Sequence, residues 1–156
     1  MHTLLCFGDS WPHGDELTPG EQPFPDLIAK KLNFKCHNFS QSSTSIQHLV
    51  PQFRNAIHHG KNSSELSYQI DDGTCFALFF VTSPIRDMLI YIDDKDNTRY
   101  EEINIESSKY GWYYKNYIDK VHYTHKTNVT ILALTQLSSI YNIRSFFVWG
   151  WDKVDL

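Results

Sequence analysis

Hydrophobic residues occur along this chain in two spacings, short continuous runs and helical stripes. Two of the runs, Thr3–Phe7 and Thr74–Val81, are almost wholly apolar and are bordered by turn-forming residues, which is typical of strands buried on both faces. Phe34–Phe39 and Arg144–Trp149 predict two further strands. The sequence therefore predicts four strands.

Helical stripes separate these strands. Pro25 suits the first turn of a helix between the first two strands, and the serine-rich stretch before Ile46 supplies N-caps for a second helix that ends at Gly60. A third helical region, one long helix or two in series, is predicted over Tyr110–Tyr141. The positions predicted to face inward are, in chain order, Phe24, Leu27, Ile28, Leu32; Ile46, Leu49, Val50, Phe53, Ile57; Tyr117, Val121, Ile131, Leu134, Leu137 and Tyr141. Ile85–Lys109 shows no clean period, and within it Asp93–Asn97 is predicted to be an exposed loop tip.

Strands that alternate with helices predict an α/β protein with a mostly parallel sheet and helices on both faces. We expect one three-layer α/β/α domain over residues 1–156, with four parallel strands in the flavodoxin-like order 2-1-3-4. The last strand leaves a long apolar edge, so a homo-oligomer, most simply a two-fold dimer, is expected. That dimer would bury this edge or the aromatic cluster at 112–117.

Composition excludes several classes of protein. The chain has 156 residues, 14 Lys and Arg against 18 Asp and Glu, and a net charge of −4, with no basic cluster that would bind nucleic acid. No apolar run approaches the roughly 20 residues of a membrane span, and the N-terminus lacks the basic region of a signal peptide, so a cytoplasmic protein is expected. Cys6, Cys36 and Cys75 are far apart and lie in predicted strands, which indicates buried thiols rather than a zinc site or disulfides. No cofactor or metal is expected.

Ligands of such sheets bind at the carboxyl ends of the strands. This rule places four segments on one rim: Gly8–Asp15, Ser40–Ser45, Thr82–Arg86 and Gly150–Asp152. The first holds Ser10, one residue beyond a Gly-Asp turn, where its hydroxyl can reach solvent and nearby backbone N–H groups can hold an oxyanion.

The block Phe7-Gly8-Asp9-Ser10-Trp11, on the first strand and within the first eleven residues, resembles the opening block of SGNH (GDSL-type) hydrolases. The longer stretch FGDSWPHGDEL is similar to short SGNH-like proteins of phages and marine bacteria. The resemblance implies that Ser10 is the nucleophile and that its N–H joins the oxyanion hole. It further implies a Gly in a second block, an Asn in a third, and an Asp-x-x-His near the C-terminus as the base.

The chain departs from that pattern in each later block. In the second block Ser42 or Ser43 stands in place of the glycine, and the third block has Thr82 and Arg86 but no Asn. We expect Ser43, Thr82 and Arg86 to supply the oxyanion and substrate contacts. The string Asp152–Asp155 has Asp where the resemblance implies the base, so the chain is expected to be short at its C-terminus relative to the family.

Another histidine could serve as the base, and His13, three residues after Ser10 in the same loop, is the candidate. Ser10, Asp9 and His13 are therefore the predicted catalytic residues; a histidine from a neighbouring subunit is the alternative base. His58 and His59 suit a helix C-terminus, and His122 and His125 a solvated helix face. The sequence thus predicts a serine ester hydrolase acting on an O-acyl ester of a carbohydrate or small metabolite, or a weakly active form of one. The alternative is an inactive SGNH-like protein that serves in binding or assembly.

Overall fold

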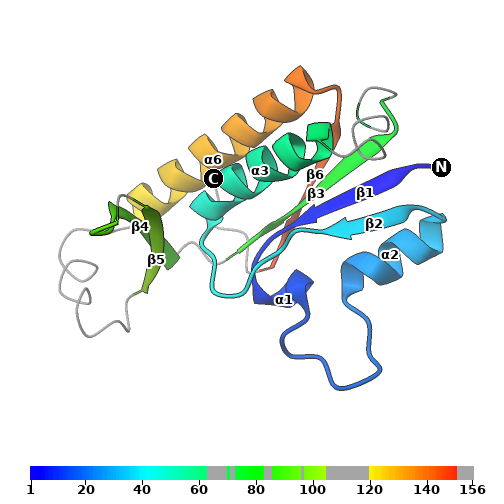
Figure 1. Ribbon diagram of the computed structural model, residues 1–156, viewed down its shortest axis with the longest axis horizontal. Helices are drawn as coiled ribbons and strands as arrows, with labels where there is room; N and C mark the ends of the chain where they lie inside the picture. The colour runs from blue at the N-terminus through cyan, green and yellow to red at the C-terminus, as the bar shows by residue number, and fades with distance from the viewer. Residues whose placement is uncertain (63–69, 71–72, 83–85, 96, 105–119, 151–156) are drawn as a thin grey trace.

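The structure, a computed structural model, describes residues 1–62, 70, 73–82, 86–95, 97–104 and 120–150. Its centre is a parallel sheet of four strands, β1 (Thr3–Phe7), β2 (Lys35–Asn38), β3 (Cys75–Val81) and β6 (Arg144–Trp149). The strands stand in the order β2-β1-β3-β6 and every neighbouring pair is parallel (Figure 1). In chain order this is 2-1-3-4, so the predicted strands and their order are confirmed.

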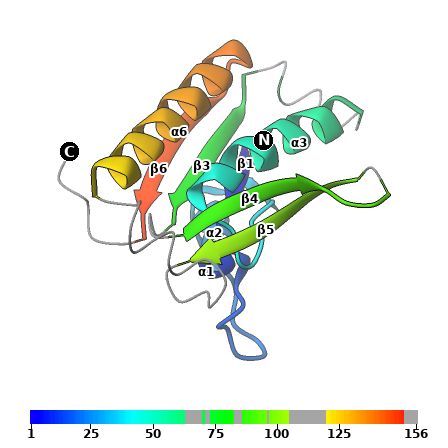
Figure 2. The same ribbon diagram turned by 90° about the vertical axis from the view of Figure 1, so that its left-hand side faces the viewer.

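Helices cover both faces of this sheet, which gives the three-layer architecture that the sequence predicts. One face carries α2 (Phe24–Leu32). The other carries α3 (Leu49–Asn62), which follows the 3₁₀ turn η1 (Ile46–His48), and α6 (Lys120–Ile140). Figures 1 and 2 show α3 and α6 side by side over the same face. The one-turn helix α1 (Ser10–His13) begins three residues after β1 ends.

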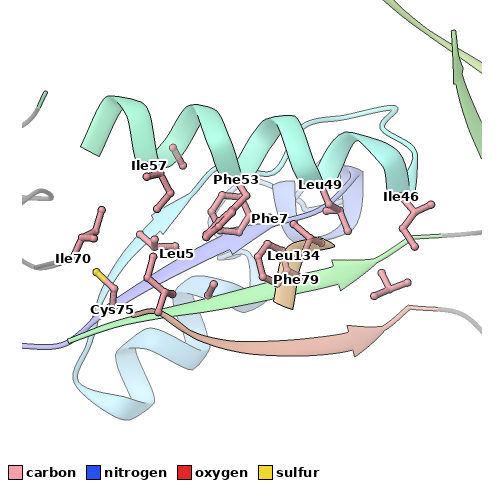
Figure 3. Packing of buried hydrophobic residues seen from close by; sticks show 14 residues of the cluster. Leu5, Phe7, Ile46, Leu49, Phe53, Ile57, Ile70, Cys75, Phe79 and Leu134 are labelled. Carbon is pink, nitrogen blue, oxygen red and sulfur yellow. The ribbon is translucent and has the colours of Figure 1, made fainter. Parts of the chain in front are cut away.

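The larger core lies between the sheet and the pair α3 and α6 (Figure 3). Successive side chains of a strand point to opposite faces, and in β1 it is Leu5 and Phe7 that point to this side. The ring of Phe79 stacks on that of Phe7, with centroids 5.2 Å apart. The predicted inward positions of the second helix are confirmed at four places that are at most 2 % exposed: Ile46, Leu49, Phe53 and Ile57. This helix continues two residues beyond Gly60, where the sequence predicts its end.

The smaller core joins α2 to the opposite face of the sheet, where Leu4 and Cys6 meet Ala29. The stripe predicted for this helix is only half right. Leu27 and Leu32 are 50 % and 53 % exposed, whereas Pro25 and Ala29 are buried. The helix is thus rotated so that its small residues meet the sheet, which lets the helix axis approach the strands closely.

A two-stranded antiparallel sheet of β4 (Arg86–Ile92) and β5 (Thr98–Asn104) is an element that the sequence analysis does not predict. Its turn coincides with the predicted loop tip at Asp93–Asn97. Figure 2 shows the hairpin near the first turns of α3, and β4 contacts η1. The predicted helix over Tyr110–Tyr141 is confirmed from residue 120 onward; the aromatic cluster at 112–117 and the string Asp152–Asp155 lie outside the described residues.

The described residues also bear on two further predictions, which concern membrane-spanning segments and the burial of the cysteine thiols. Within the ranges given above, no helix is long and apolar enough to cross a membrane. The prediction of buried thiols holds for Cys6 and Cys75, which have no exposed surface, while Cys36 is partly exposed. Burial raises the pKa of Cys6 and of Cys36 to about 12 and that of Cys75 to about 11, so these thiols stay protonated and unreactive near neutral pH.

Candidate active site

Gly8 joins β1 to α1 in a space too small for any side chain. A Cβ atom at this position would lie 2.5 Å from Cγ of Pro12 and 2.9 Å from Cβ of Phe80. The Gly8 carbonyl accepts hydrogen bonds from the hydroxyl of Thr44 and the amide of Gln52, each at 3.1 Å. The loop after β2 and the helix α3 therefore both fix the backbone just before Ser10.

Asp9 is the N-cap of α1 and is 2 % exposed. Its Oδ1 accepts from the backbone N–H of Trp11 at 3.2 Å, and its Oδ2 accepts from the hydroxyl of Thr82. Thr82 follows β3 directly and is also buried, so this bond ties the ends of two neighbouring strands together. The Asp9 carboxylate and the Thr82 hydroxyl thus hold each other in place.

Ser10 is the first residue of α1 and is partly exposed at the carboxyl end of β1. Its carbonyl accepts from the backbone N–H of Gly14 at 2.8 Å and from that of Asp15 at 3.2 Å, which closes the turn. Within the described residues its hydroxyl makes no hydrogen bond to the protein. The hydroxyl is thus placed on the rim, on a fixed backbone, as the sequence predicts.

The loop between β2 and η1 brings Ser43 to the same rim. The backbone N–H of Gln41 donates to the Gly8 carbonyl at 3.0 Å, and Thr44 binds that same oxygen. Ser43, between them, is exposed and has a φ of 55°, in the left-handed region that favours glycine. The serine that replaces the expected glycine thus adopts the backbone conformation of a glycine.

His13 ends α1, three residues after Ser10, and its Nδ1 donates to the carboxylate of Asp15. The other oxygen of that carboxylate accepts from the hydroxyl of Ser42. An imidazole that donates through Nδ1 carries its lone pair on Nε2, where it can take up a proton. Ser10 and His13 are the first and last residues of the single turn of α1.

Sequence reasoning singles out Ser10, His13 and the pair Ser42 and Ser43, but it gives no role to Asp15. It also gives none to the exposed Trp11, whose ring centroid is 6.1 Å from that of Phe80. Asp15 could have been found from the sequence, because it stands two residues after His13. A short turn can bring a carboxylate at that spacing back to a ring nitrogen of the imidazole. Arg86 begins β4, but its side chain and residues 83–85 lie outside the described residues, so its oxyanion role stays a prediction.

Within the described residues, no group of three or more His, Cys, Asp or Glu side chains could hold a metal ion. The groups that the described residues bring to the rim are a hydroxyl, an imidazole paired with a carboxylate, and backbone N–H groups. Together they suit attack on a carbonyl carbon followed by proton transfer.

The likeness of this chain to known proteins is distant. No family model and no curated protein matches the chain. A solved structure from Slackia heliotrinireducens, named "a putative SGNH hydrolase", is similar over 97 % of this chain with a TM-score of 0.41 and 9 % sequence identity. The chain covers 58 % of that protein. At this identity and TM-score the likeness says nothing about activity.

Proposed function

We propose that this chain is a serine ester hydrolase of the SGNH type, with Ser10 as its nucleophile, acting on an O-acyl ester of a carbohydrate or small metabolite. One observation carries the proposal: a partly exposed serine hydroxyl at the carboxyl end of β1, on a backbone fixed through Gly8 and Asp9. That rim is where parallel α/β sheets place their ligands.

The reaction would proceed in two steps. In the first, Ser10 Oγ attacks the ester carbonyl, its proton passes to a base, and the alcohol leaves with that proton while the acyl group stays on Ser10. In the second, water gives a proton to the base and attacks the acyl carbon, and the base returns that proton to Ser10 Oγ as the acid leaves. The backbone N–H groups of Ser10 and Ser43 are the proposed donors to the oxyanion.

His13 is the proposed base, because Asp15 holds the tautomer that leaves Nε2 able to accept the Ser10 proton. Rates of ester hydrolysis should then depend on this imidazole. His13→Gln should lower them by about 10²- to 10⁴-fold. A fast wild-type enzyme whose rate survives His13→Gln would assign the base to a histidine elsewhere, in the chain or on a neighbouring subunit.

A fluorophosphonate probe tests the nucleophile itself. The wild type should form one covalent adduct, found on Ser10 by peptide mass spectrometry, and Ser10→Ala should form none. Ser139→Ala, an exposed serine of α6, is the matched control and should label like the wild type. Ester hydrolysis should be lost in the Ser10 variant alone.

The second candidate, an inactive SGNH-like binding or assembly protein, is favoured by one feature of the site. Within the described residues no imidazole is hydrogen-bonded to the Ser10 hydroxyl. A folded wild type that takes up no probe at any pH between 6 and 9, where a serine with a working base would react, would support this candidate and contradict the hydrolase.

A further inference from the structure

A groove of about 610 Å³ runs between α3 and α6 on the outer surface of the molecule. The two helices contact each other directly and lie side by side over the sheet (Figures 1 and 2). A volume of this size falls within the range of about 300–1,000 Å³ that small-molecule sites occupy. The proposed hydrolase reaction uses none of the residues that line this groove.

The walls of the groove are largely apolar. From α3 they include Val50 and Pro51, and from α6 they include Val129 and Ala133. Val129 is 51 % exposed, although an apolar side chain on the middle of a helix is usually turned inward. An exposed apolar strip of this kind, bordered by polar groups, marks a surface suited to an apolar ligand.

Basic side chains border the strip on both helices. Arg54 projects from α3, and Lys126 lies on α6, where its Nζ is 5.3 Å from the centre of the Tyr123 ring. Two imidazoles, His122 and His125, complete the set on α6. No described residue of the lining is acidic, although the chain as a whole has a net charge of −4. Positive charge is thus concentrated here.

We propose that the groove binds a small amphipathic anion, a single hydrocarbon chain that ends in a carboxylate or a phosphate. The chain would lie against Val50 and Val129, where it loses contact with water. The anionic head would meet Arg54, which makes no ion pair within the described residues, and Lys126, which lines the same groove from α6. The proposal does not depend on Ser10.

Octanoate is the probe that tests this groove. Titration into the ¹⁵N-labelled wild type should move the amide signals of Val129 and Thr130 in a saturable way, and octyl phosphate should do the same. Octanol and octylammonium have the same chain without the negative charge, and each should bind at least about threefold more weakly, as expected for the loss of one charged contact. Equal binding of octanol, or tighter binding of octylammonium, would overturn the proposal.

Variants at exposed positions locate the site without threatening the fold. Arg54→Gln should raise the dissociation constant of octanoate at least about threefold. Val129→Asp, which adds a negative charge to the apolar wall, should abolish saturable binding. Lys31→Gln on α2 removes an equally exposed charge outside the groove and should bind like the wild type. Failure of octanoate to bind the folded wild type contradicts the proposal; signals that move only with protein concentration would instead assign the groove to a second copy of the chain.

Discussion

Asp9 and Ser10 are neighbours in the same turn but have different surroundings. Asp9 is buried, and each of its carboxylate oxygens accepts a hydrogen bond, one from the Trp11 N–H and one from the Thr82 hydroxyl. Ser10 is partly exposed, and its hydroxyl makes no bond to the described protein. The Asp of the motif therefore stabilises the turn, while the Ser is available to a substrate.

Replacing these two residues should separate stability from activity. Asp9→Ala removes the cap of α1 and leaves the Thr82 hydroxyl buried without its acceptor, so it should lower the free energy of unfolding by about 2–4 kcal/mol. Asp9→Asn keeps an oxygen for the cap and should cost less. Ser10→Ala should change stability by no more than about 0.5 kcal/mol, as an exposed hydroxyl does. Urea unfolding followed by circular dichroism measures all three; equal losses in Asp9→Ala and Ser10→Ala would show that Ser10 too is structural.

The residues of the site differ in how far the sequence predicts them. Ser10 can be predicted because a buried strand ends just before it, and parallel strands place such ends on a rim. The bond from Thr82 to Asp9 joins residues 73 positions apart, and the bond from Ser42 to Asp15 joins residues 27 apart. Polar pairs at such separations leave no periodic signal in one sequence, so they emerge only once the strands are placed side by side.

At the scale of elements, prediction succeeds for the apolar runs. β1 begins and ends where the sequence predicts, because a strand buried along its whole length is a continuous apolar run. β6 also begins and ends at the predicted residues, although its residues alternate between exposed and partly buried. The hairpin of β4 and β5 is missed because β5, TRYEEIN, is mostly polar and shows no alternation of apolar and polar residues. Its strands pair with each other and, among the described strands, with no others. The pairing of these two strands and the turn that joins them therefore define this element.

The turn of this hairpin should be sensitive to Asp93. Its side chain accepts from the backbone N–H of Lys95 at 2.9 Å, from that of Asn97 at 3.0 Å and from Nε of Arg99 at 2.7 Å. The bond from Asn97, followed by that from Arg99, lowers the pKa of Asp93 below 3.8. A lowered carboxyl pKa means that the charged form stabilises the folded turn above pH 3.8, and that this stabilisation is lost as pH falls through the lower, folded value.

Asp93→Ala should therefore speed amide hydrogen exchange at Lys95 and Asn97 near neutral pH. The overall melting temperature should hardly change, because the turn is exposed and separate from the core. Asp93→Asn keeps an acceptor oxygen and should fall between the wild type and the alanine variant. Unchanged exchange in Asp93→Ala would mean that the strand pairing holds the turn without this side chain.

For the whole molecule, the feature that bears on self-association is the edge of the sheet at β6. β6 pairs with β3 on one side and, within the described residues, with no strand on the other. Phe146 and Val148 lie on the same face of the sheet as α2. Their side chains are 53 % and 37 % exposed. The ring of Phe146 stacks on Phe76, with centroids 6.3 Å apart, so this apolar surface continues onto β3. An apolar edge of this kind favours pairing with another chain.

We therefore expect two copies of this chain to associate through β6 about a two-fold axis, which would join their sheets and cover Phe146 in both. Light scattering at micromolar concentration should give twice the 18.3 kDa of one chain. Phe146→Lys should shift this mass toward the monomer, because it places like charges opposite each other across the axis. Leu132→Lys makes the same change at a residue of α6 that is 61 % exposed, away from β6, and should leave the dimer intact. A monomeric wild type would contradict the prediction, and loss of the dimer in the Leu132 variant alone would move the interface to α6.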